Sequence, residues 1–239
     1  PIPCMMGPMN RPYRWMGRVI AALWIVLLAV PARGQEPLTR PERTDGLETS
    51  RYADVMAFID SVADAPVLHP TTFGYTYEGR PLPLVVVGTN LPDGSPESVA
   101  ATGRTRVLVM ANIHGGEVEG KEAAQILLRR FAAGGHRGWL DSLVVLVAPI
   151  YNADGNERVS VSNRFRQHGP LGGVGERANA QGLDLNRDHT KLESPEARSL
   201  VQLMTEYDPH LVVDLHTTNG TYHGYHLTYA PPLHPNTEA

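Results

Sequence analysis

The stretch RVLVMANIHGGEVEGKEAAQILLRRFAAGG, residues 106–135, contains an apolar run, a polar turn and a helical pattern in succession. The run RVLVMAN (106–112) is rich in Val and Leu without alternation, which is typical of a strand buried on both faces of a sheet. The segment 119–135 carries apolar residues at helical spacing and closes on glycines. The stretch therefore predicts one strand–helix unit of an α/β protein.

Three further apolar runs of the same kind predict strands, over 81–88, 142–149 and 210–215, and residues 73–80 predict a turn before the first of them. Helices are predicted over 51–64 and 194–209, the second with Ser194 as its N-cap. Strands that alternate with helices indicate an α/β fold with a mixed, largely parallel sheet flanked by helices.

The first 34 residues have the layout of a secretory signal peptide. Residues 9–18 carry three arginines and no acid, residues 19–30 are continuously apolar, and small residues precede the expected cleavage after Gly34. Twelve apolar residues fall short of the ~20 that a membrane span needs. The layout predicts a secreted or periplasmic protein without a stable membrane anchor after cleavage. Residues 1–8 are interpreted as upstream readthrough, because the sequence starts with Pro1 rather than Met.

After the signal peptide, residues 35–48 are polar and Pro-containing, and they predict a flexible lead-in to one domain over 49–239. Removal of residues 1–34 takes away four of the 21 basic residues and none of the 25 acidic ones, so the net charge falls from −4 to −8. This argues against a nucleic-acid surface, which needs clustered positive charge. The only cysteine, Cys4, lies before the signal, so the mature chain has no disulfide and no thiol nucleophile.

The turn after the first strand places His114 and Glu117 three residues apart with two glycines between them. A solvated turn explains such a pair as well as a metal site does. His216, at the end of another predicted strand, favours the metal, because functional residues gather at the carboxyl ends of strands in α/β sheets. Two imidazoles and one carboxylate form a three-ligand zinc site that leaves a fourth position for water. Such a zinc ion polarises a carbonyl and lowers the pKa of its water towards ~7.

The segment GERANAQGLDLNRD (175–188) supplies candidate partners for this site. Asp184 can accept the second ring N–H of a ligating histidine and fix its tautomer. Arg177 and Arg187 are cations suited to oxyanions and carboxylates, although a surface loop explains either one alone. Arg164 and Arg166 compete with Arg177 for the role beside an oxyanion.

Five segments together resemble the zinc carboxypeptidase family, the carboxypeptidase A-like metallopeptidases: GYTYEGRPLPLVVVG, NIHGGEVEG, PIYNADGN, RANAQGLDLNRD and VVDLHTT. The resemblance covers roughly residues 50 to 220 and implies the fold of that family. It implies one Zn²⁺ on His114, Glu117 and His216, with Asp184 behind the first histidine. It also implies that Arg177 stabilises the tetrahedral oxyanion and that Asn186 and Arg187 grip the carboxylate of the substrate.

The sequence departs from that family in two places. The carboxylate base of the family follows the last histidine ligand by several tens of residues, and here the only acid after His216 is Glu238. We therefore expect a domain that is incomplete at its C-terminal end, can bind zinc without being active, and exposes apolar surface. The second departure is Asp188–His189, where carboxypeptidases of the family commonly have Asn and an aromatic residue.

The predicted function is an exported zinc metallocarboxypeptidase that hydrolyses C-terminal bonds of peptides with a free carboxylate. One alternative is an N-acyl amino acid deacylase of the succinylglutamate desuccinylase or aspartoacylase type, which shares the H-G-x-E and D-L-N-R elements. Cell-wall peptides are another candidate substrate. A non-catalytic zinc- or peptide-binding module is the alternative from a different class.

Overall fold

The computed structural model describes residues 36–167, 169–218 and 221–231. From Pro37 onward these residues belong to one compact unit. The predicted signal peptide, its cleavage site at Gly34 and the upstream residues lie outside the described residues. No helix in the described ranges is long and apolar enough to cross a membrane.

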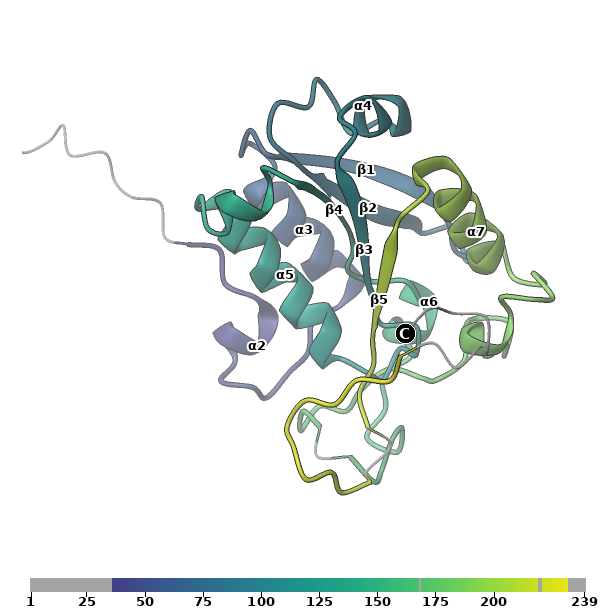
Figure 1. Ribbon diagram of the computed structural model, residues 1–239. Coiled ribbons are helices and arrows are strands. Elements are labelled where there is room, and N and C mark those ends of the chain that lie inside the picture. The colour runs from purple at the N-terminus through teal and green to yellow at the C-terminus, as the bar shows by residue number, and fades with distance from the viewer. Residues whose placement is uncertain (1–35, 168, 219–220, 232–239) are drawn as a thin grey trace, which may run out of the picture. The chain divides into compact units, whose positions relative to one another are not determined.

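A five-stranded mixed sheet forms the centre of the unit, with strand order β1-β2-β4-β3-β5 (Figure 1). The strands are β1 Leu68–Tyr75, β2 Pro81–Val87, β3 Thr105–Ala111, β4 Leu143–Ala148 and β5 Leu211–Leu215. β3 pairs parallel with β4 and with β5, whereas β2 pairs antiparallel with β1 and β4. The predicted fold class is confirmed, and the parallel trio has its carboxyl ends at one edge of the sheet.

The sequence analysis missed β1, because it predicts a turn for the residues from Phe73 onward. This strand lies at the end of the sheet and leaves most of its side chains partly or fully exposed. Its pattern therefore lacks the continuous apolar run of a buried strand. Pro70 within it is tolerated because an edge strand has one side without ladder partners.

Helices cover both faces of the sheet and make three layers (Figure 1). Apolar side chains of α3 (Tyr52–Val62) and α5 (Glu119–Ala132) pack with one face of β2 and β4. Side chains of α4 (Pro96–Ala101) and α7 (Pro195–Tyr207) pack with the other face. The remaining helical segments are short: α2 Arg40–Arg43, η1 Arg137–Trp139, α6 Ala153–Glu157 and η2 Leu185–Arg187.

Part of the lead-in forms the short helix α2. This helix begins with a capping box in which Thr39 and Glu42 bond each other's backbone N–H. Glu42 also accepts two hydrogen bonds from Arg129 of α5, at 2.8 and 2.7 Å. The helix was not predicted, because a short cap and one long-range ion pair leave no periodic pattern in the sequence; the flexibility of the lead-in stays a prediction.

A buried polar network fixes the start of α5, and therefore the turn before it. Lys121 is fully buried and donates from Nζ to the carbonyl oxygen of Ser50 at 2.5 Å and to Oδ1 of Asn156 at 2.6 Å. Glu122 accepts from the N–H of Ser50 and from the hydroxyl of Thr49, both at 2.8 Å. Burial lowers the pKa of Lys121 to about 8. The network joins α5 to α6 and to residues 49–50, which lie between the lead-in and α3.

Candidate metal centre

Asn112 turns the chain away from β3 and towards the predicted ligands. Its φ is 63°, in the left-handed region that Asn adopts more readily than most residues. The buried Nδ2 of its side chain donates to the carbonyl oxygens of His114, Gly115 and Glu117, at 3.3, 3.3 and 3.2 Å. The turn is thus held from inside by one amide, a role that the sequence analysis did not assign.

The two glycines of the turn allow neighbouring loops to approach closely. A Cβ on Gly115 would lie 2.4 Å from the carbonyl carbon of Gly155, and one on Gly116 would lie 2.6 Å from the carbonyl oxygen of Gly175. Real Cβ atoms do not approach backbone atoms this closely. The residue of this turn with a left-handed backbone is Asn112, and the two glycines make room for the loops that carry the other site residues.

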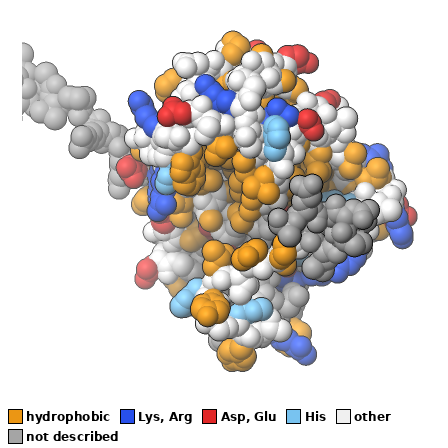
Figure 2. Space-filling view, viewed as in Figure 1, with side chains coloured by type: hydrophobic (Ala, Val, Ile, Leu, Met, Phe, Trp, Pro, Cys, Tyr) orange, Lys and Arg blue, Asp and Glu red, His pale blue; other side chains and the backbone are white. Residues whose placement is uncertain are grey.

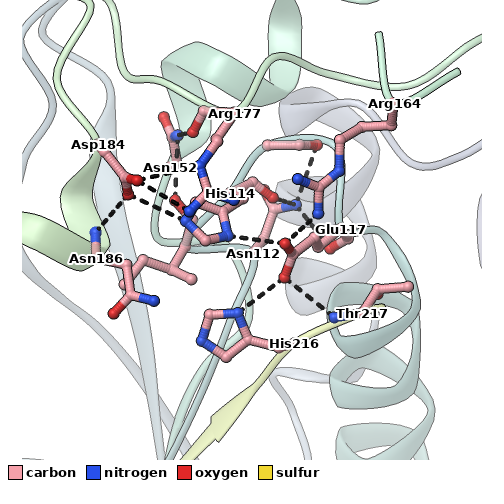
Figure 3. Close-up of polar contacts among 12 residues, drawn as sticks. Asn112, His114, Glu117, Asn152, Arg164, Arg177, Asp184, Asn186, His216 and Thr217 are labelled. Carbon is pink, nitrogen blue, oxygen red and sulfur yellow. Dashed lines mark hydrogen bonds and ion pairs between the residues drawn. The ribbon is translucent and has the colours of Figure 1, made fainter. Parts of the chain in front are cut away.

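The turn and the end of β5 bring the three predicted ligands together (Figure 3). Oε1 of Glu117 lies 2.8 Å from Nδ1 of His114, and Oε2 lies 2.9 Å from Nδ1 of His216. One ligand atom from each residue lies within 4.8 Å of the others. His114 and Glu117 are buried, whereas the His216 side chain is 35% exposed, so the site opens on the His216 side.

Asp184 lies behind His114, as the sequence analysis predicted. Its Oδ1 is 3.1 Å from Nε2 of His114 and accepts the backbone N–H of Asn186 at 3.0 Å. Its Oδ2 accepts two hydrogen bonds from Arg177, at 3.0 and 2.9 Å. Burial opposes ionisation of Asp184, but the bonds from Arg177 and His114 outweigh it and lower its pKa.

The three arginines near the site differ in whether they contact a predicted metal ligand. Arg164 forms an ion pair directly with Oε1 of Glu117, whereas Arg177 reaches the site through Asp184. The side chain of Arg187 is exposed, and its Nη1 donates to the carbonyl oxygen of Asn186 at 2.8 Å. The structure therefore places Arg177 and Asn186 beside the ligand group, adds Arg164, and shows no contact between Arg187 and the ligands within the described ranges.

Asp214 is the partner of His216 that the sequence analysis missed. Its Oδ2 lies 2.8 Å from Nε2 of His216, the residue that follows the end of β5. The hydrogen bonds with Asp214 and Glu117 raise the pKa of His216 to about 10. Burial opposes ionisation of Glu117, but its bonds with the two histidines and with the N–H of Thr217 bring its pKa well below the usual range. The sequence feature that could have indicated this role is one acidic residue within a strand otherwise made of Val and Leu.

The donor set fits a zinc ion. Both histidines direct Nδ1 towards the same carboxylate, and each has a carboxylate at Nε2, an arrangement typical of histidines that bind zinc through the other nitrogen. Two imidazole nitrogens and one carboxylate match the ligand sets of catalytic zinc sites. The Asn152 side chain joins the ligand turn to the loop of Arg177, by donating to the carbonyl oxygens of Ile113 and Arg177 at 3.2 and 3.1 Å.

Known proteins share this sequence pattern and fold. The chain is 29% identical over 143 residues to carboxypeptidase 2 of Trichophyton rubrum. The aligned region covers 58% of this chain and 23% of that protein. The chain is 31% identical over 161 residues to human carboxypeptidase D, covering 55% of this chain and 12% of that protein. The chain therefore spans about a quarter or less of the length of these relatives.

Solved structures agree at the level of the fold. The carboxypeptidase A of Helicoverpa armigera matches with a TM-score of 0.58 at 17% identity, over 84% of this chain and 53% of that one. A metallo-carboxypeptidase of Burkholderia cenocepacia matches with a TM-score of 0.56 at 24% identity, over 72% of this chain and 42% of that one. A profile described as zinc carboxypeptidase matches residues 55–238. The chain belongs to the zinc carboxypeptidase family.

Proposed function

We propose that the protein carrying this chain is an exported, zinc-dependent metallocarboxypeptidase that removes C-terminal residues from peptides. The observation that supports this most directly is the convergence of His114, Glu117 and His216, whose ligand atoms lie within 4.8 Å of one another at the ends of two parallel strands. Membership of the zinc carboxypeptidase family supports hydrolysis of peptide bonds as the reaction. The signal-like N-terminus supports export to the periplasm or the extracellular space.

Each group near the site then has a distinct task. His114, Glu117 and His216 hold one zinc ion, which when bound supplies Lewis-acid activation of a water and of the scissile carbonyl. Asp184 orients His114, and Arg177 beside it offers a cation to the oxyanion of the tetrahedral intermediate. Asn186 and Arg187, in η2 directly after Asp184, bind the terminal carboxylate of the substrate.

Zinc binding is the first experiment, because it does not require activity. The purified chain is expected to hold one zinc per molecule, and His216→Ala is expected to lose it, since two ligands rarely retain zinc against dialysis. The metal content of both proteins, measured after removal of free zinc, checks this. Stoichiometric zinc in the variant would refute the ligand assignment.

The second experiment measures the preference for a free C-terminal carboxylate in the substrate, and it uses the whole protein that carries this chain. A peptide with a free C-terminus should be cleaved roughly ten- to a hundred-fold more efficiently than its C-terminal amide, the effect of one charge-assisted contact. Arg187→Ala should narrow that preference. Equal rates on acid and amide would remove the carboxypeptidase assignment. Consumption of an N-acyl amino acid, with no peptide cleavage, would instead favour the deacylase alternative.

A further inference from the structure

Asp214 is a carboxylate inside the apolar strand β5, whose sequence is LVVDL. It pairs in register with Met110 of β3, which is itself buried. The Asp214 side chain is 29% exposed, so its carboxylate has lost part of its water, which is costly unless a hydrogen-bonding partner compensates. The partner here is the imidazole of His216, with Oδ2 and Nε2 2.8 Å apart.

The geometry of the strand explains why these two side chains meet. Residues two apart in a strand point to the same face, so Asp214 and His216 lie on one side of the end of β5. Nε2 of His216 is directed towards Asp214, while Nδ1 lies 2.9 Å from Oε2 of Glu117. Both ring nitrogens therefore face carboxylates, which accept hydrogen bonds and cannot donate them. A zinc ion on Nδ1 would take the lone pair of that nitrogen and leave the single proton of a neutral His216 on Nε2, facing Asp214.

Asp214 differs from Asp184 in the number of hydrogen bonds that its carboxylate accepts. Asp184 receives two hydrogen bonds from Arg177 and one from the N–H of Asn186, besides its contact with His114. Oδ1 of Asp214 is buried and has no hydrogen-bond partner among the described residues. The contact that the structure gives to the Asp214 carboxylate is therefore the one with His216.

The two histidines also differ in how firmly their surroundings hold them. The His114 side chain is 3% exposed, whereas that of His216 is 35% exposed. Packing alone can fix the ring of His114. The ring of His216 has solvent on one side, so its orientation depends more on the hydrogen bonds at its two nitrogens.

We propose that Asp214 is a positioning residue that holds the His216 ring with Nε2 protonated and Nδ1 directed at the metal. This inference rests on the proposed zinc site and extends it to a carboxylate–histidine pair on the second histidine ligand. Outer partners of this kind typically change metal affinity by about 10- to 100-fold when removed.

The test uses Asp214→Ala and Asp214→Asn, with Glu206→Gln of α7 as a control that removes one acid away from the site. Zinc affinity is measured by competition with a chromophoric chelator. The hydrogen bond between the Nε2–H of His216 and Asp214 is measured by the exchange of that proton with water, in ¹H–¹⁵N NMR of the metal-free protein. Asp214→Ala should weaken zinc binding by about 10- to 100-fold and leave the Nε2–H proton in fast exchange. Asp214→Asn keeps an oxygen acceptor, so it should retain slow exchange and lose less affinity. The control should match the unmodified chain in both measurements.

The outcomes separate this inference from the proposed function. If the unmodified chain binds no zinc, the proposed function fails, while the NMR measurement still decides whether Asp214 holds the Nε2–H of His216. If the unmodified chain binds zinc and Asp214→Ala binds it equally well, with the Nε2–H proton still in slow exchange, the inference is overturned. Should Asp214→Ala fail to fold, Asp214→Asn decides: wild-type zinc affinity together with a fast-exchanging Nε2–H proton would overturn it as well.

Discussion

At the scale of single residues, Asn112 determines whether the ligand turn can form. It joins a left-handed backbone conformation to three hydrogen bonds from one buried amide nitrogen. Few other side chains meet both demands, because most L-residues avoid the left-handed region and lack a short amide.

Two substitutions separate the demands on Asn112. Asn112→Gly removes the hydrogen bonds and keeps the backbone unstrained, whereas Asn112→Ala removes the bonds and adds left-handed strain. Both should lower the free energy of unfolding by about 1–3 kcal/mol for the buried carbonyls left without a donor. The Ala variant should be the less stable of the two by about 1 kcal/mol. Urea unfolding checks the order, and an Ala variant as stable as the Gly variant would contradict the assigned conformation.

The sequence predicted which residues would meet at the site, but not how they are held. His114, Glu117 and His216 follow apolar strands directly, so the rule that strand ends gather in α/β sheets was enough to place them together. The roles of Asn112, Asn152 and Asp214 depend on short contacts between segments far apart in the sequence or on one hydrogen bond within a strand. Arg164 was identified only as a competitor of Arg177, and its direct contact with Glu117 comes from the path of its loop.

At the scale of elements, buried strands and capped helices were predictable, and segments with weak patterns were not. α7 follows Ser194, whose hydroxyl accepts the N–H of Ala197 at 3.0 Å, as the N-cap prediction required. By contrast, β1 is largely exposed, and α2 has only four residues. Long-range packing stabilises these two elements, and such contacts cannot be predicted from the local pattern of a single sequence.

The attachment of α2 to α5 gives a prediction with a pH dependence. The hydrogen bond from Arg129 lowers the pKa of Glu42 to about 2, below the value of about 4.3 expected in an unfolded chain. The stabilising contribution of Glu42 is therefore fully present above pH ~4.5 and is lost as the pH falls towards 2. Glu42→Gln should lower the unfolding free energy at pH 7 by about 0.5–1 kcal/mol, since the pair is partly exposed.

Urea unfolding of both proteins between pH 7 and pH 2 checks this. The difference between Glu42→Gln and the unmodified chain should shrink with decreasing pH and vanish near pH 2. Glu48→Gln is the matched control, because Glu48 pairs with Arg40 of the same segment in a more exposed position. It should change stability little at any pH. If the difference in unfolding free energy between Glu42→Gln and the unmodified chain stays constant with pH, the charge of the Glu42 carboxylate does not stabilise the packing of α2 on α5.

At the scale of the whole molecule, β5 is the strand of the described sheet with the least cover, because none of its residues is buried. Among the described residues it pairs with β3 and with no other strand. Leu211 and Val212 are 54% and 37% exposed, although neighbouring strands of the same composition are buried. Figure 2 shows apolar side chains gathered near the middle of the face on which α5 and β5 lie in Figure 1. The apolar surface that the sequence analysis expected therefore includes this edge.

An exposed apolar edge strand is a template for pairing with another chain. We therefore expect this chain to self-associate in a concentration-dependent manner, and Leu211→Lys to reduce that association by placing a charge on the edge. Sedimentation velocity over a range of concentrations measures it. Met204→Lys is the control, because Met204 is an exposed apolar residue of α7, away from the strand edge.

The substitution at Leu211 should also leave zinc binding intact, which separates the edge from the metal site. Leu211 begins β5, and His216 follows its last residue, so about five residues at ~3.3 Å each place them roughly 16 Å apart along the strand. A Leu211→Lys protein that is more monomeric and binds zinc like the unmodified chain would assign association to the edge alone. A monomeric unmodified chain, or an equal effect of Met204→Lys, would show that β5 is not the surface through which copies of this chain meet.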